Sequence, residues 1–194
     1  INRAERPLIY AGGGVITAEA SVQLTELAEK ADIPVVSTLM NLGAISRKHP
    51  LSLGMVGMHG QKEANQAVHN SDLLITIGAR FSDRVTGDVN HFAKNAVIAQ
   101  IDIDESEIDK NVVVDLSLIG DMREILSRLL EKTEKKKNPV WLEKIDSFRV
   151  PKAISEDAFV PQNIFKVIHE VLGDDVIVAT DVGQHQMWTA QEWP

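Results

Sequence analysis

Two arginines follow an apolar run at a spacing that suits a phosphorylated ligand. Arg80 and Arg84 lie within residues 78–87, which have a glycine at each end and come directly after the apolar residues 73–77. A guanidinium is planar with forked donors, so it can bind a diphosphate or a carboxylate bidentately. If residues 73–77 form a buried strand, this loop lies at the carboxyl edge of a sheet, where α/β folds bind nucleotides. The stretch therefore predicts an extended, doubly phosphorylated ligand, with surface ion pairs to neighbouring aspartates as the alternative.

Glycines and a carboxylate follow two other apolar runs. Gly12, Gly13 and Gly14 come after residues 7–11, and Asp102 lies near the end of residues 96–103. A glycine loop lets a phosphate approach the backbone, and a carboxylate at a strand end can accept hydrogen bonds from ribose hydroxyls. The glycine loop lacks the third glycine of the usual dinucleotide motif, so a plain tight turn is equally open. Asp102 could likewise cap a turn.

Composition excludes several other classes of chemistry. The chain has 194 residues, no cysteine and a formal net charge of −8. Without cysteine there is neither a disulfide framework nor a thiolate zinc site, which suits a cytoplasmic location. The negative charge argues against binding to nucleic acid or an anionic membrane, and the apolar runs are too short to span a bilayer. The histidines, His59 between two glycines included, show no metal-ligand spacing, so we expect no metal site.

Alternating apolar runs and helical patterns must position these residues. The expected strands are residues 7–11, 34–38, 72–77, 96–103 and 116–119, and the expected helices are 61–69, 122–134 and one capped by the hydroxyl of Thr17. Residues 39–60 are predicted to be an irregular connection. Continuous β-branched runs are typical of parallel strands that are covered on both faces. The pattern predicts an α/β fold with a doubly wound parallel sheet whose ligand loops share one edge.

A change of composition divides the chain. The lysines at 135–137 and Pro139 end the helical pattern, and a short linker helix is expected at 140–149. A helix over 161–172 and a buried strand over 176–181 then indicate the start of a second α/β domain. We therefore expect a central domain at 1–135, a linker at 136–160, and at 161–194 a truncated second domain.

The longest motifs together resemble one enzyme family. Residues 10–14, 38–40, 53–60, 78–87, 101–104 and 181–191 are similar to the large catalytic subunit family of acetolactate synthase, a group of thiamine-diphosphate enzymes. The resemblance is collinear over almost the whole chain. It implies a Rossmann-like central domain that binds FAD in an extended conformation.

The resemblance also implies which residues contact the flavin nucleotide. They occupy the expected strand-end loops: Gly12, Gly13, Gly14, Thr38, Leu39, Met40, Met58, His59, Gly78, Ala79, Arg80, Arg84, Val85, Asp102, Ile103, Gly120 and Asp121. The chain departs from the family at Ser82, where an acidic residue is usual, so Ser82 is not assigned to the site. Asp83 is a candidate only for lining a channel.

A second cofactor is implied near the end of the chain. Gly183, Gln184 and His185 resemble the family's loop at the diphosphate of thiamine diphosphate. The family's catalytic glutamate and its Mg²⁺ motif match no residue of this chain. We therefore assign no complete catalytic set and no metal ligand here, and we expect this chain to be inactive by itself.

The implied reaction joins two 2-oxoacids. Pyruvate loses CO₂ on thiamine diphosphate and condenses with pyruvate or 2-oxobutyrate, in branched-chain amino-acid biosynthesis. The resemblance also implies a homo-oligomer and a possible regulatory small subunit. Alternatives are a related thiamine-diphosphate carboligase, decarboxylase or oxidase, or a non-catalytic nucleotide-binding module.

Overall fold

The computed structural model describes residues 1–149 and 156–193 of the chain. It divides into two compact units, with the boundary between Arg149 and Val150. The first unit holds the sheet and the second holds two helices.

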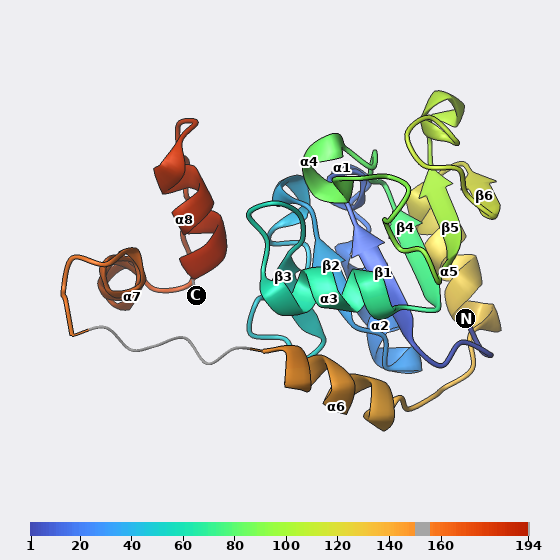
Figure 1. The fold of residues 1–194 in the computed structure, drawn as a ribbon, viewed down its shortest axis with the longest axis horizontal. Coiled ribbons are helices and arrows are strands. Elements are labelled where there is room, and N and C mark those ends of the chain that lie inside the picture. The colour runs from blue at the N-terminus through green and yellow to red at the C-terminus, as the bar shows by residue number, and fades with distance from the viewer. Residues whose placement is uncertain (150–155, 194) are drawn as a thin grey trace. The chain divides into compact units, whose positions relative to one another are not determined.

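The first unit is built on a parallel six-stranded sheet with the order β3-β2-β1-β4-β5-β6 (Figure 1). The strands are β1 (Pro7–Ala11), β2 (Val35–Ser37), β3 (Ser52–Met55), β4 (Leu73–Ile77), β5 (Val97–Asp102) and β6 (Leu116–Ile119). Every adjacent pair is parallel. The chain runs outward from β1 to β3 and then returns to β4, beside β1. This arrangement confirms the predicted doubly wound α/β fold.

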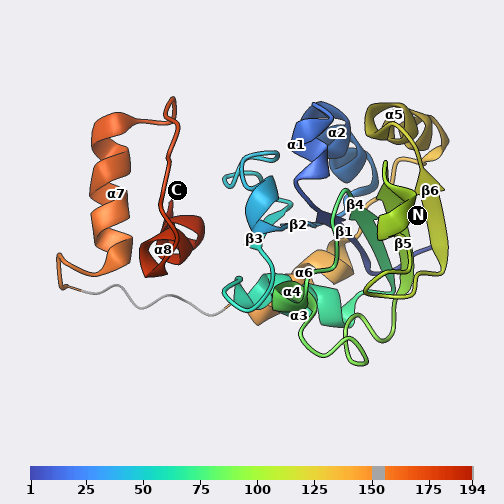
Figure 2. The same ribbon diagram turned by 90° about the horizontal axis from the view of Figure 1, so that it is seen from above.

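Helices cover both faces of the sheet, as the two views show (Figures 1 and 2). The helices are α1 (Gly14–Thr17), α2 (Ser21–Ala31), α3 (Lys62–Asn70), α4 (Asp83–Thr86), α5 (Met122–Lys132) and α6 (Pro139–Phe148), with 3₁₀ turns η1 (Leu39–Asn41) and η2 (Glu105–Glu107). On β1, Ile9 and Ala11 face the core beneath α2 and α5, and Leu8 and Tyr10 face the core beneath α3 and α6. Burial on both faces explains the continuous apolar run.

Strand β3 lies inside the segment that the sequence predicts to be irregular, so that prediction is wrong. Its inward side chains are Leu53 and Met55, which alternate with partly buried positions. Gly54 has a φ of +76°, and the register with β2 shifts between Val35 and Ser37. So short and interrupted a pattern carries too little periodicity to indicate a strand.

The predicted cap at Thr17 is also wrong. Thr17 ends the short helix α1, and its hydroxyl donates to the Gly13 carbonyl at 3.2 Å. Glu19, at φ +52°, turns the chain before α2 begins at Ser21. A threonine hydroxyl bonds as readily to the carbonyl four residues back as to an amide of a following helix.

Helix α6 is fastened to the first unit. Asp32 ends α2 in the left-handed conformation, at φ +54°, and its carboxylate accepts hydrogen bonds from the Asn138 amide at 2.8 Å and from the Lys137 ammonium at 3.2 Å. The buried Trp141 donates its indole N–H to the Pro7 carbonyl at 2.9 Å. The helical part of the expected linker therefore belongs to the first compact unit. Residues 150–155 of that linker lie outside the described residues.

The second unit contains α7 (Pro161–Leu172) and α8 (Gln184–Glu192). The proline at the first turn of α7 matches the sequence expectation. Residues 176–181 form no strand, which contradicts the prediction, and the Ile177 side chain is fully exposed. A strand needs a neighbour for its backbone hydrogen bonds, and residues 156–193 supply none.

The buried Tyr10 hydroxyl generates a test of the core. This hydroxyl has no hydrogen-bond partner among the described residues, and burial raises the pKa of Tyr10. The Tyr10 ring stacks on the ring of Phe81 at a centroid distance of 5.7 Å. Because an unsatisfied buried hydroxyl destabilises the fold, Tyr10→Phe should raise the free energy of unfolding by about 1 kcal/mol. Trp141→Phe, which leaves the Pro7 carbonyl unpaired, should lower it by about 1–3 kcal/mol. Urea unfolding measures both, and a clear loss in Tyr10→Phe would contradict the assignment.

Candidate functional site at the carboxyl edge of the sheet

All six strands of the first unit end at one edge, because the sheet is parallel. The loop after each strand carries predicted site residues: 12–14 after β1, 38–40 after β2, 58–59 after β3, 78–80 and 84–85 after β4, 102–103 after β5, and 120–121 after β6. The structure therefore gathers every predicted flavin residue at this edge. Each loop also contacts a neighbour, as the following distances show.

The loops after β1 and β4 meet backbone to backbone. The Gly12 amide donates to the Ile77 carbonyl at 2.8 Å, and the Gly14 amide donates to the Gly78 carbonyl at 3.1 Å. A Cβ on Gly12 would lie 2.6 Å from the Cα of Ala79, and a Cβ on Gly14 would lie 2.8 Å from the Cα of Gly78. These two glycines are therefore required by the contact between the loops, whether or not a phosphate binds there.

Apolar side chains are exposed around the same edge. Met40, Met58 and Ile103 are 74%, 74% and 73% exposed, and Leu39 is partly exposed as well. They come from the loops after β2, β3 and β5. Flexible methionines beside a branched aliphatic side chain can cover the flat faces of an aromatic ring system. Thr38 closes the β2 end, because its amide donates to the Ala11 carbonyl at 2.9 Å.

Asn65 holds the loop after β3 in place. Its side-chain amide accepts from the Gly57 N–H and donates to the Gly57 carbonyl, both at 2.9 Å. Gly57 has a φ of +112°, a conformation that favours glycine. The next amide, of Met58, donates to the Arg84 carbonyl at 2.9 Å, which joins this loop to helix α4. Exposed His59 follows directly.

A cavity of about 380 Å³ lies where these two loops meet. Its lining includes Met58, Arg84 and Val85 among the predicted residues, together with Asp83 and Phe92. A volume of this size lies within the range of small-molecule sites. Asp83 lines this cavity, and its role in lining a channel stays a prediction.

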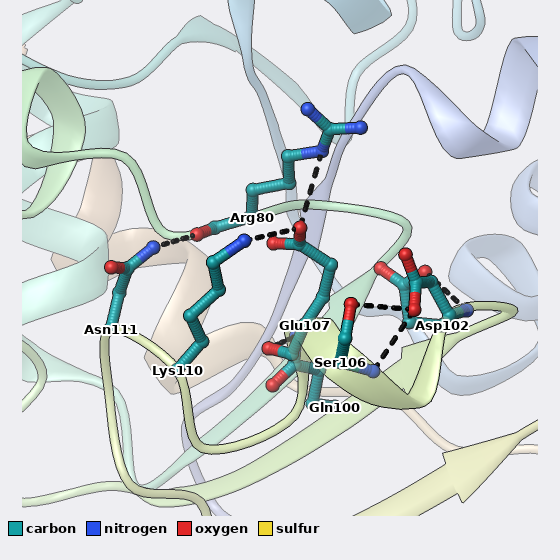
Figure 3. A network of polar contacts seen from close by, with 8 residues as sticks. Arg80, Gln100, Asp102, Ser106, Glu107, Lys110 and Asn111 are labelled. Atoms are coloured by element: carbon teal, nitrogen blue, oxygen red, sulfur yellow. Dashed lines mark hydrogen bonds and ion pairs between the residues drawn. The ribbon is translucent and has the colours of Figure 1, made fainter.

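A polar network joins the loops after β4 and β5 (Figure 3). The Arg80 Nε atom lies 3.9 Å from a carboxylate oxygen of Glu107, and Asn111 donates to the Arg80 carbonyl at 2.8 Å. Asp102 is largely buried, and its carboxylate accepts from the Asp104 amide at 3.1 Å. Asp102 therefore does shape a turn, which was the alternative to ribose binding. The hydroxyl and amide of Ser106 hold the pKa of Asp104 below its ordinary value.

Among the described residues, neither site arginine forms an ion pair with the neighbouring Asp83 or Asp88, which was the alternative to anion binding. Within residues 1–149, Arg80 faces Glu107, and the carboxylate of Asp83 accepts from the backbone amide of Arg84 at 2.9 Å. Asp88 pairs with His91 at 2.7 Å, and this hydrogen bond lowers the pKa of Asp88. Arg80 thus has Glu107 as a carboxylate partner, and the Asp83 carboxylate bonds the backbone of Arg84 rather than its guanidinium.

The remaining predicted residues have structural roles that the contacts define. The Gly120 amide donates to the Asp102 carbonyl at 3.0 Å, and the Asp121 carboxylate caps α5 by accepting from the Glu124 amide at 3.0 Å. Gly183 precedes α8 at a φ of +156°, with exposed Gln184 and His185 in the first turn. These three residues belong to the second unit.

Sequence reasoning missed four residues of this edge. Asn65, Glu107 and Asn111 contact predicted residues, and Lys110 pairs with Glu107, but these four residues show no apolar periodicity and no motif. The one available signal is Asn65, a poor helix former inside a helical pattern.

The described residues contain neither a metal-binding cluster nor a membrane-spanning helix. Residues 1–149 and 156–193 contain no cluster of histidine, aspartate and glutamate that could hold a metal ion. No helix within those ranges is long and apolar enough to cross a membrane.

Comparison with known proteins defines the class. Residues 1–129 match the family described as "Thiamine pyrophosphate enzyme, central domain". The chain belongs to this family of thiamine-diphosphate enzymes, and the residues matched include the whole sheet and all its strand-end loops.

Curated relatives are similar over nearly the whole chain. A "Probable acetolactate synthase large subunit" of Methanocaldococcus jannaschii is 48% identical over 98% of this chain, which spans 34% of that relative. The acetolactate synthase large subunit of Corynebacterium glutamicum is 45% identical over 98% of the chain and 32% of its own length. The large subunit of acetolactate synthase isozyme 1 of Escherichia coli is 41% identical over 100% of this chain, which spans 35% of that relative. The chain thus spans about a third of the length of these relatives.

The contact between the loops at Gly12 can be tested by substitution, with the same substitution at Gly13 as the control. Gly12→Ala should lower the free energy of unfolding by about 1–3 kcal/mol, because the new methyl group collides with backbone atoms. Gly13 has helical dihedral angles, φ −56° and ψ −21°, and its added Cβ would meet the Cβ of exposed Met40 at 3.0 Å. Gly13→Ala should cost less than about 1 kcal/mol, because a small shift of the exposed turn at Met40 would relieve this contact, whereas the contacts at Gly12 are shorter and involve the backbone of the neighbouring strand's loop. Equal losses in urea unfolding would contradict the assigned contact.

Proposed function

We propose that the chain is the FAD-binding central portion of an acetolactate synthase large subunit, with the beginning of its thiamine-diphosphate domain. One observation carries the proposal: the loops after all six strands bring the predicted residues to a single edge. The similarity to curated acetolactate synthase large subunits supports it.

The residues at this edge fit a flavin dinucleotide. Leu39, Met40, Met58 and Ile103 offer apolar surface to aromatic rings, and Arg80 and Arg84 offer positive charge to a diphosphate. Asp102 offers a carboxylate to ribose hydroxyls. The cavity beside Met58 and Arg84 is large enough for part of such a ligand.

The chain's own residues would bind and orient the cofactors. The sheet-edge loops hold FAD, which does no net redox chemistry in this proposal and organises the site. Gly183, Gln184 and His185 meet the diphosphate end of thiamine diphosphate, and the Mg²⁺ that accompanies it is held by residues that this chain does not contain. Thiamine diphosphate supplies an electron sink when bound.

The substrates in this proposal are 2-oxoacids. The complete enzyme condenses pyruvate with pyruvate or 2-oxobutyrate, with loss of CO₂, in branched-chain amino-acid biosynthesis. We propose a cytoplasmic homo-oligomer that can associate with a regulatory small subunit. The family match and the curated relatives support this assignment.

Flavin titration tests the proposed cofactor site. FAD should bind the chain in preference to ADP and NAD, measured by the change of flavin fluorescence and by competition. Asp102→Asn should weaken FAD binding roughly tenfold, because a charged acceptor is lost. Glu105→Gln, an exposed carboxylate of the same segment, is the matched control and should bind as the parent does. Preference for ADP or NAD would favour a non-catalytic nucleotide-binding module instead.

Turnover gives a separate prediction. The chain alone, supplied with pyruvate, thiamine diphosphate, FAD and Mg²⁺, should form no acetolactate, because the catalytic glutamate and the Mg²⁺ motif of the family match none of its residues. A colorimetric acetolactate assay measures this. Product above a no-protein control would show that these residues suffice.

A further inference from the structure

Glu107 is a buried carboxylate between two cations (Figure 3). Its side chain is 9% exposed, and one oxygen lies 2.7 Å from the Lys110 ammonium and 3.9 Å from the Arg80 Nε atom. Its other oxygen is buried without a hydrogen-bond partner among the described residues. A buried charge that is incompletely bonded destabilises a fold, so stability alone gives no reason for a carboxylate here.

The position of Glu107 is fixed by the sheet. Its backbone carbonyl accepts a hydrogen bond at 3.1 Å from the side-chain amide of Gln100, which is fully buried on β5. The neighbouring residues Glu105 and Ser106 of η2 are exposed, and only Glu107 turns inward. The carboxylate is therefore presented from a rigid element.

Arg80 is held at two points. Asn111 donates to its backbone carbonyl at 2.8 Å, and Glu107 faces its Nε atom. The side chain beyond is 79% exposed, and Figure 3 shows both terminal nitrogens pointing away from Glu107. The edge formed by these two terminal nitrogens is the one that can bind two oxygens of a single anion, and it does not face Glu107. Lys110 shares the carboxylate of Glu107, and the carboxylate of Asp104 also lies within electrostatic reach of Lys110 and Arg80.

We propose that Glu107 is a positioning residue that orients the Arg80 guanidinium toward the diphosphate of a flavin dinucleotide. The proposal rests on the FAD site proposed above and adds a residue outside the predicted set. Glu107 acts through Arg80 and does not contact the ligand. Its removal should therefore weaken only those ligands that carry the phosphates that Arg80 binds.

The test compares FAD with riboflavin, which has the same ring system and no phosphate. Arg80→Ala and Glu107→Gln should each weaken FAD binding roughly tenfold or more and leave riboflavin binding unchanged. The double variant Arg80→Ala/Glu107→Gln should bind FAD no more weakly than Arg80→Ala alone, because both changes remove the same interaction. Glu105→Gln is the control and should match the parent for both ligands.

The outcomes separate the two proposals. No FAD binding by the parent chain would overturn the FAD site itself. Parent-like FAD binding by Glu107→Gln, beside a weakened Arg80→Ala, would overturn only the role of Glu107. Equal weakening of FAD and riboflavin would assign Glu107 to stability, as would additive losses in the double variant. If Glu107→Gln does not fold, Glu107→Asp keeps the charge, withdraws it by one methylene, and should give the same selective loss.

Discussion

The contact between the turns after β1 and β4 is the constraint on which the site depends. Strands β1 and β4 are neighbours at the point where the strand order reverses, with β2 and β3 on one side and β5 and β6 on the other. Because Gly12, Gly14 and Gly78 have no side chains, the two turns approach at backbone distance. On either side of this contact lie exposed apolar side chains, with Met40 and Met58 toward β3 and Ile103 toward β6. A side chain on Gly12 or Gly14 would collide with the backbone of the neighbouring turn and push the two loops apart.

Electrostatics at the edge are local. The chain has a net charge of −8, yet the loop after β4 presents two guanidinium groups. Glu107 lies 3.9 Å from the Nε atom of Arg80, and the carboxylate of Asp83 accepts a hydrogen bond from the backbone amide of Arg84. Oriented donors at a strand end can hold an anion in a protein whose overall field repels it, because screening limits the reach of distant charges to about one Debye length.

Much of the fold and part of the site could be predicted from residue patterns. Long apolar runs such as Pro7–Ala11 and Leu73–Ile77 are buried on both faces and are recognisable by composition. Strand β3 was not predictable, because Leu53 and Met55 alone do not make a periodic pattern and its pairing with β2 is non-local. The run 176–181 shows the converse, since apolar composition without a neighbouring strand gives no strand.

The site divides in the same way. Glycines and arginines at strand ends are visible by type and place. Glu107 and Asn111 act on Arg80 from another loop, 27 and 31 positions along the chain, and Asn65 acts on Gly57 from a helix. Such partners depend on the tertiary structure, so spacing along the chain cannot indicate them.

The segments before β1 and after α5 are joined by hydrogen bonds. Asn2 donates to the Lys132 carbonyl at 3.3 Å and accepts from the Glu134 amide at 3.1 Å, and the Lys136 ammonium bonds to the Ala4 carbonyl. This junction precedes β1, so it lies at the amino edge of the sheet, opposite the cofactor loops. The segment that leads into the sheet and the segment that follows α5 therefore lie side by side. A sheet module of this kind can sit within a longer polypeptide, or be exchanged between polypeptides, while the loops at its far edge stay undisturbed.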